Sequence, residues 1–361
     1  MPAQLREHRW AAIALAAALA LAACGGSGDD EDADGTSTAA DGTAAATDDA
    51  TTTTAAADDT AGTSTSAPGT STTGAAGAPE PELPITLVDD TGTEVTIESI
   101  DRIVPLDGDL AEVVFALGLG DNVVATDLSA TYPPEADALP EIGYQRSLVP
   151  EPIAAMEPTV LLASDLAGPV ETLETLRELG FPLVVIDQDP TIDGPATKVR
   201  RVGEALGIPD AGEALAAEVE ADIDEALTLV PDDVDPPRIM SMYVRGGGLQ
   251  LVFGEGSGMD ALIEAIGGVD VGTELGIEDN GPLTEEALAL AAPDVILVTD
   301  SGLESVDGID GLLDASGLAR TPAGEDRRVL SYDDQLLFGL GPRTGELITR
   351  LVADIHGERA G

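Results

Sequence analysis

Two tyrosine–arginine pairs are the residues of this sequence whose types and spacing could bind a metal. Tyr144 and Arg146 stand two positions apart, and so do Tyr243 and Arg245. In an extended segment, side chains two positions apart point to the same side, which brings each guanidinium beside a phenol. A free phenol titrates near pH ~10, and a neighbouring positive charge lowers that pKa. Each pair could therefore supply a phenolate, a ligand suited to ferric iron.

Haem iron is one such ferric centre, because tyrosine is a known axial ligand of protein-bound haem. Tyr144 and Tyr243 are the ligand candidates. Core packing is the alternative for both. Tyr243 lies in the apolar run 239–244, where a tyrosine commonly packs in the core with its hydroxyl at the rim. Tyr144 follows Gly143 in a loop, where core packing is less natural.

Arginines could also bind the carboxylates of such a ligand. We expect Arg146 and Arg245 to support a phenolate or a propionate. Arg343 lies in the segment Gly341-Pro-Arg343-Thr344 at the start of the last helical pattern. A guanidinium fork suits a haem propionate, but it could equally pair with a nearby acidic side chain or lie at the surface.

Histidine-based metal sites and catalytic sites are disfavoured, because the sequence has few histidines and lacks a common nucleophile motif. The two histidines are His8, near the start of the chain, and His356, in the last helical segment. An imidazole ligand to haem or a histidine-rich zinc site is therefore not expected. No Gly-x-Ser-x-Gly motif is present, and a single histidine outside the leader offers no triad. We expect no enzymatic activity.

Short apolar runs alternate with helical patterns, and these elements must position the candidate residues. We expect strands at 103–106, 123–125, 160–163, 183–186, 239–244, 295–298 and 329–332. We expect helices at 109–117, 169–179, 196–206, 210–229, 258–266, 283–291 and 343–356. This alternation predicts an α/β fold with parallel sheets covered on both sides. We predict two Rossmann-like lobes, joined by the long helix 210–229.

Composition sets the expected boundaries along the chain. Residues 1–23 resemble a lipoprotein signal peptide, and the apolar run that ends at Ala23 is too short to span a bilayer. Cys24, the one cysteine, is the expected point of lipid attachment. Residues 24–84 are an acidic Thr/Ala/Asp-rich segment that we expect to be a disordered tether. The two lobes then occupy 85–195 and 233–361, with a linker helix region at 196–232.

The sequence is strongly acidic, with a formal net charge of −52 at pH 7. Such a surface disfavours binding to nucleic acid or to anionic lipid. It is better explained by solubility or by salty surroundings than by the choice of ligand.

Four segments, 102–118, 143–148, 243–248 and 340–344, resemble class III substrate-binding proteins of ABC importers, and above all bacterial haem-binding proteins. The resemblance implies an extracytoplasmic lipoprotein, anchored to the cell membrane through Cys24, that captures haem between two lobes. It also implies delivery to the permease and ATPase subunits of a haem importer. Tyr144 and Tyr243 match positions that ligate haem iron in such proteins, and Arg245 matches an arginine beside the second tyrosine. We expect a monomer.

Glu151 and Glu286 occupy matching positions in an internal repeat, in which 148–163 aligns with 283–298 without a gap. In the family, acidic residues on the rim of each lobe dock onto the permease. The alternative is that each carboxylate complements the dipole of a helix that it begins.

Two other functions stay open. The same fold could bind cobalamin or a ferric siderophore, although such ligands usually meet aromatic walls that this domain lacks. The chain could also be a lipoprotein that binds a partner protein and no small ligand.

Overall fold

The computed structural model describes residues 79–284, 288 and 290–357. All of them belong to one unit, Thr73–Gly361. The expected signal peptide, Cys24 and residues 24–78 of the expected tether lie outside the described residues, and so does Glu286. Among the helices that are described, none combines the length and apolarity needed to cross a bilayer.

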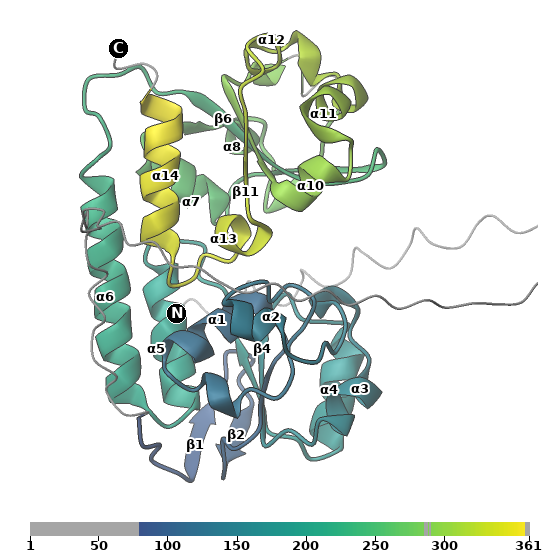
Figure 1. The fold of residues 1–361 in the computed structure, drawn as a ribbon, viewed down its shortest axis with the longest axis vertical. Coiled ribbons are helices and arrows are strands. Elements are labelled where there is room, and N and C mark those ends of the chain that lie inside the picture. The colour runs from purple at the N-terminus through teal and green to yellow at the C-terminus, as the bar shows by residue number, and fades with distance from the viewer. Residues whose placement is uncertain (1–78, 285–287, 289, 358–361) are drawn as a thin grey trace, which may run out of the picture. The chain divides into compact units, whose positions relative to one another are not determined.

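The first part of the described chain is a hairpin followed by a parallel sheet (Figure 1). Strands β1 (Ile85–Val88) and β2 (Glu94–Ile97) pair antiparallel. Strands β3 (Ile103–Pro105), β4 (Val160–Ser164) and β5 (Leu183–Ile186) then form a parallel sheet in the order β3-β4-β5. Every residue of these three strands is buried, as the continuous apolar runs predict for strands covered on both faces.

Helices surround this first sheet. They are α1 (Gly108–Ala116), α2 (Pro134–Asp137), α3 (Pro150–Ala155) and α4 (Val170–Glu178). Short 3₁₀ turns, η1 (Gly120–Asn122) and η2 (Gln145–Ser147), lie between them. The strand expected at 123–125 is reduced to a single parallel bridge between Val123 and Ile103, so that part of the prediction is wrong.

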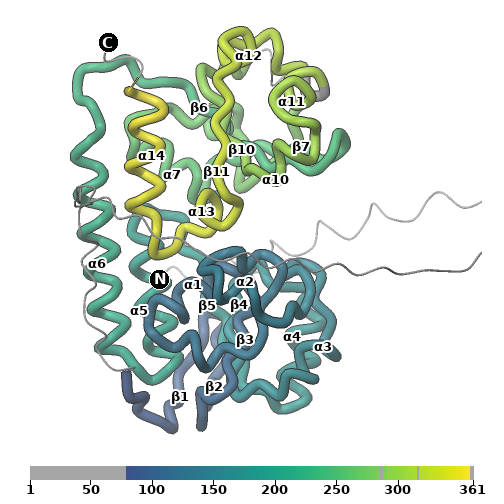
Figure 2. The backbone as a smooth tube through the Cα atoms, viewed as in Figure 1, coloured from purple at the N-terminus to yellow at the C-terminus, as the bar shows by residue number. Residues whose placement is uncertain are grey.

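Two helices connect the sheets, α5 (Gly194–Ala205) and α6 (Pro209–Leu227). They pack closely on each other, and α6 also packs on the last helix, α14 (Thr344–His356). Figure 2 shows α6 running beside both α5 and α14. The buried residues of α6, which include Ala216, Val219 and Ile223, recur at helical spacing and form one apolar stripe along the helix.

The second sheet is mixed, with the order β11-β10-β6-β7-β9 and β8 paired to β6. Its strands are β6 (Arg238–Arg245), β7 (Leu249–Phe253), β8 (Val269–Asp270), β9 (Asn280–Pro282), β10 (Val295–Thr299) and β11 (Val329–Tyr332). Strands β6, β8, β10 and β11 are parallel to one another, whereas β7 pairs antiparallel with β6, and β9 pairs antiparallel with β7. The fold is therefore α/β with parallel sheets, and an antiparallel extension continues the second sheet beyond β6.

Short helices connect the strands of the second sheet. They are α7 (Met259–Ala265), α8 (Val271–Glu274), α10 (Asp300–Glu304), α11 (Gly308–Ser316), η3 (Leu318–Arg320), α12 (Pro322–Glu325) and α13 (Asp334–Phe338).

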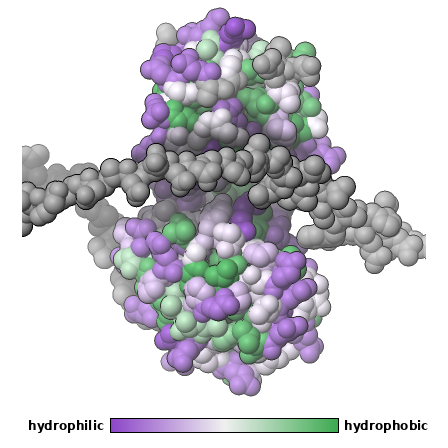
Figure 3. Space-filling view, turned by 90° about the vertical axis from the view of Figure 1, so that its right-hand side faces the viewer, coloured by the Kyte–Doolittle hydropathy of each residue, from purple (hydrophilic) through white to green (hydrophobic). Residues whose placement is uncertain are grey.

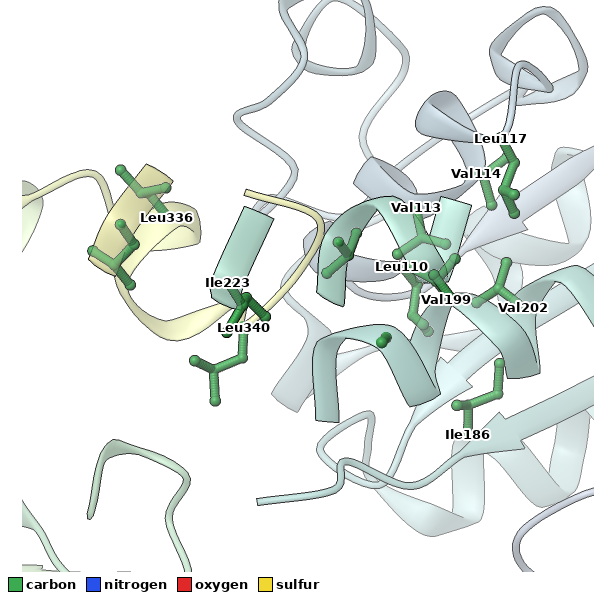
Figure 4. Packing of buried hydrophobic residues seen from close by; sticks show 14 of the residues in the cluster. Leu110, Val113, Val114, Leu117, Ile186, Val199, Val202, Ile223, Leu336 and Leu340 are labelled. Carbon is green, nitrogen blue, oxygen red and sulfur yellow. The ribbon is translucent and has the colours of Figure 1, made fainter. Parts of the chain in front are cut away.

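The largest apolar cluster joins the helices to both sheets. In Figure 4, Leu110 and Val113 of α1 lie against Val199 and Val202 of α5. Ile223 of α6 and Leu340, which follows α13, belong to the same cluster. Burial of these side chains removes apolar surface from water and fixes the first sheet against the helices that lead to the second.

Candidate ligand-binding site

Tyr243 and Arg245 lie on the same side of β6. Their neighbours Met242 and Val244 are buried, whereas Tyr243 and Arg245 are half-buried. The guanidinium carbon of Arg245 lies 4.8 Å from the centroid of the Tyr243 ring, within the range of a cation–π contact. The alternation of a strand therefore places the guanidinium beside the phenol, as the spacing predicts.

Tyr144 reaches the same place from a loop of the first part of the chain. It directly precedes η2 and follows Gly143, whose φ of +109° suits glycine. Burial raises the pKa of Tyr144 above its ordinary value, and a hydrogen bond with Tyr243 raises it further. Arg146 opposes this rise through its charge and a hydrogen bond to the Tyr144 hydroxyl. Tyr144 and Tyr243 are therefore close enough for each to affect the titration of the other.

Arg245 is held by a carboxylate that the sequence patterns did not identify. Its Nη2 donates to Oδ1 of Asp334 at 2.7 Å, and Asp334 is the first residue of α13. Burial works against the charge of Arg245, but the Asp334 hydrogen bond and the nearby tyrosines leave its pKa raised. In so acidic a chain, one more aspartate gives no sequence signal, and only the fold reveals its partner.

Arg343 has partners within the protein. Its Nε and Nη2 donate to Oε1 and Oε2 of Glu112, both at 2.9 Å, and its guanidinium stacks 3.7 Å from the Tyr132 ring centroid. The Gln335 amide nitrogen also donates to Oε2 of Glu112. The structure therefore places Arg343 in the ion pair that was the alternative to propionate binding, joining α14 to α1.

Buried acids support the loop that carries Tyr144. The Asp127 carboxylate accepts hydrogen bonds from the backbone and hydroxyl of Ser129 and, at 3.3 Å, from the Gln145 nitrogen. Burial raises the pKa of Asp127 to about 7. Burial, and then the charge of Asp109, raise the pKa of Asp107 to about 8. Asp127 thus ties Gln145, the residue after Tyr144, to the body of the fold, whereas Asp107 accepts hydrogen bonds from the backbone and hydroxyl of Ser164 at the end of β4.

Of the two glutamates expected on the rims, one is described. Glu151 is exposed in the first turn of α3, where its charge complements the helix dipole. Glu286 lies outside the described residues. No group of three or more His, Cys, Asp or Glu in the described part of the chain is arranged to hold a metal ion.

Residues 103–336, which span both sheets and both tyrosines, match the periplasmic binding protein family. The chain belongs to this family. Periplasmic binding proteins are non-enzymatic components of transport, and the α/β fold with parallel sheets is that of the class III members.

Solved structures similar to this periplasmic binding protein include several haem-binding proteins. One is the haem-binding protein RhuT of Roseiflexus sp. RS-1 in apo form, with 47% identity, a TM-score of 0.69, and coverage of 71% of this chain and 98% of that chain. Another is the haem-binding protein HmuT, with 35% identity, a TM-score of 0.72, and coverage of 76% and 91%. The haem-binding protein BhuT, in complex with two haems, has 36% identity, a TM-score of 0.65, and coverage of 70% and 97%.

Curated relatives of this periplasmic binding protein are more distant. An uncharacterised ABC transporter substrate-binding lipoprotein of Bacillus subtilis strain 168 is 23% identical, over 76% of this chain and 86% of the relative. A cobalamin-binding protein of Halobacterium salinarum is 26% identical, over 76% of this chain and 74% of the relative. The expected membership of a substrate-binding family with haem-binding neighbours is therefore confirmed.

Proposed function

We propose that this protein is an extracytoplasmic haem-binding lipoprotein of an ABC importer. The observation that carries the proposal is the proximity of Tyr144, from a loop in the first part of the chain, to Tyr243, from β6 of the second sheet, each accompanied by an arginine. Haem iron binds at this place, through Tyr144, Tyr243 or both.

The chemistry of the described residues supports ferric haem. A phenolate suits a ferric ion, and the arginines beside the tyrosines favour loss of the phenol proton once iron is present. Arg146 is exposed and available to a propionate, while Arg245 supports the phenolate from β6. We assign Arg343 to the propionates only if Glu112 gives up its ion pair. The similarity to haem-binding proteins at 35–47% identity adds support.

The remaining expectations complete the proposal. Cys24 carries the lipid, 24–84 tether the binding part, and the lobes span 85–195 and 233–361 around a linker region at 196–232. Glu151 and Glu286 dock onto the permease, which passes haem inward with the help of an ATPase subunit. The protein acts as a monomer and binds no nucleic acid.

Cobalamin is the second candidate ligand, because a cobalamin-binding protein of Halobacterium salinarum matches three quarters of this chain. A cobalamin site needs no phenolate, so it would leave the two tyrosine–arginine pairs without a role. A ferric siderophore could use phenolates but brings its own iron ligands.

Ligand identity is tested by titrating the purified protein with haemin, cyanocobalamin and a ferric siderophore in parallel. We expect a saturable change in the haem absorption spectrum and no saturable binding of the other two ligands. Tyr332→Phe is the matched control, because the Tyr332 hydroxyl is engaged by Asp354 at 2.7 Å, and this variant should bind haemin as the wild type does. Saturable binding of cobalamin without binding of haemin would overturn the proposal.

A further inference from the structure

Asp334 makes contacts that reach beyond a simple surface ion pair. Its Oδ1 accepts hydrogen bonds from Nη2 of Arg245 and from the Ser301 hydroxyl, and its Oδ2 accepts from the Ser301 backbone nitrogen at 3.3 Å. Ser301 lies in the first turn of α10, and Thr299 caps that helix by accepting from the Gly302 nitrogen. The Asp334 carboxylate is thus held by Ser301 of α10 as well as by Arg245.

Arg245 is held on more than one side. Its Nη1 donates to the carbonyl of Val244 at 3.1 Å. A Cβ added to Gly302 would lie 3.6 Å from the same nitrogen, so α10 passes close beside the guanidinium. The side chains of Arg245 and Asp334 are 38% and 31% exposed, so without the carboxylate the guanidinium could move into solvent. Asp334 therefore limits where the positive charge can lie.

Helix α13, which carries Asp334, also contacts Tyr243, the partner of Arg245 in the tyrosine–arginine pair. The Phe338 ring, at the end of α13, lies 6.4 Å from the Tyr243 ring and 4.9 Å from the Phe253 ring, measured between centroids. Asp333 caps α13 by accepting from the Leu336 nitrogen, which fixes the start of this short helix. One helix thus positions the tyrosine through Phe338 and its arginine through Asp334.

We propose that Asp334, supported by Ser301, is a positioning residue that holds the Arg245 guanidinium against the Tyr243 ring and so sets the affinity of this site for haem. The effect of Asp334 on haem affinity rests on the proposed function. The position of the guanidinium itself does not depend on any ligand.

A double-mutant cycle with haemin tests whether Asp334 works through Arg245. We expect Asp334→Ala and Arg245→Ala each to weaken haemin binding by about tenfold, the lower end for loss of an outer-shell partner at a metal site. The double variant should bind no more weakly than Arg245→Ala alone, because the aspartate has no function without its arginine. Losses that multiply in the double variant would overturn the proposal.

Two further variants separate positioning from damage to the fold. Asp310→Ala removes another aspartate of the second sheet's helices, whose ion pair with Arg327 is exposed, and it should leave haemin affinity unchanged. Ser301→Ala removes the support and leaves the ion pair, so it should weaken binding in the same direction as Asp334→Ala but by less. If Asp334→Ala failed to fold, an unchanged affinity in Ser301→Ala would count against the proposal.

A measurement without ligand tests whether Asp334 positions Arg245, even if the protein does not bind haem. In protein labelled with ¹⁵N-arginine, the Nε–H signal of Arg245, assigned by its loss in Arg245→Lys, should broaden or shift towards that of free arginine in Asp334→Ala. It should not change in Asp310→Ala. An unchanged Arg245 signal in Asp334→Ala would refute the positioning role, whereas absence of haemin binding by the wild type would refute the proposed function alone.

Discussion

At the scale of single residues, burial determines the pKa of Asp127, the carboxylate that accepts a hydrogen bond from the residue after Tyr144. Asp127 is surrounded by protein and accepts hydrogen bonds from Ser129 and Gln145, which favour its charged form. Burial outweighs these bonds and raises the pKa of Asp127 to about 7. Gln145 is the residue after Tyr144. The Asp127 carboxylate, whose charged form is disfavoured by burial, therefore also holds the loop that carries Tyr144.

This balance predicts how stability depends on pH. The pKa of Asp127 is higher in the folded than in the unfolded protein. At pH values between the two pKa values, the folded state therefore binds more protons than the unfolded state. The free energy of unfolding should therefore fall as pH rises from ~5.5 to ~8, a window in which ordinary exposed carboxylates are already charged. Asp107, whose pKa burial raises to about 8, contributes to the same fall, so Asp127→Asn should make the fall smaller without removing it. Urea denaturation at several pH values measures it.

Asp310→Asn is the matched control, because it removes an exposed carboxylate and should keep the slope of the wild type. A wild-type protein whose stability rose across this pH window would contradict the account of Asp127.

Individual residues also show where sequence reasoning reaches its limit. The i, i+2 rule was enough to place Arg245 beside Tyr243, since the backbone of a strand determines that geometry. It could not identify Asp334 or Glu112 as the partners of Arg245 and Arg343, because these pairs join residues far apart in sequence. Whether Arg343 faces a propionate or an acid of the protein is decided by the packing of α14 on the rest of the fold.

At the scale of elements, the contact between α5 and α6 depends on two glycines that face each other. A Cβ added to Gly203 would lie 2.7 Å from Cα of Gly212, and a Cβ added to Gly212 would lie 3.0 Å from Cα of Gly203. Both contacts are with backbone, which cannot rotate away. The helices that connect the two sheets therefore approach each other closely only because neither residue has a side chain.

Gly203→Ala should accordingly destabilise the protein in spite of the better helix propensity of alanine. Overpacking of a tight contact typically costs about 1–3 kcal/mol, and we expect a loss in this range by urea denaturation. Gly247→Ala is the control, because nothing lies within 4 Å of the position where its Cβ would be. Equal stability of the two variants would show that α5 and α6 can separate without cost.

Strands formed by a clear apolar run were predictable from sequence, whereas strands without such a run and very short helices were not. The runs at 160–163, 183–186 and 329–332 became β4, β5 and β11 with bounds that differ by at most one residue. Strands β7 and β9 were missed, because both mix polar residues with apolar ones and β9, at the edge of the sheet, has only three residues. Helix α13 has five residues, too few for a helical period to show, although it carries Asp334.

At the scale of the whole molecule, the excess of acidic side chains is the dominant property. The chain has a formal net charge of −52, and Figure 3 shows hydrophilic residues distributed between hydrophobic ones on the face in view. So large a charge keeps a protein soluble, but self-repulsion destabilises the compact state. Some ion pairs of the described residues, such as Arg327–Asp310 and Arg350–Glu346, are exposed on both sides, and each such pair contributes little.

Added salt should therefore stabilise the protein. The Debye length falls from about 10 Å at 0.1 M to about 3 Å at 1 M, which screens repulsion between carboxylates that are not in contact. We expect the free energy of unfolding to rise with NaCl concentration over this range, and to rise more than in sucrose, which leaves ionic strength unchanged. A decrease with NaCl would mean that attractive pairs outweigh repulsion.

The most direct test of the site is the absorption and resonance Raman spectrum of the ferric haem complex in tyrosine variants. We predict a phenolate-to-iron charge-transfer band in the wild-type complex, and its loss in the variant that carries both Tyr144→Phe and Tyr243→Phe, with haemin affinity at least tenfold weaker. The single variants will show which phenol binds iron. A double variant that bound haemin with the affinity and spectrum of the wild type would contradict the account.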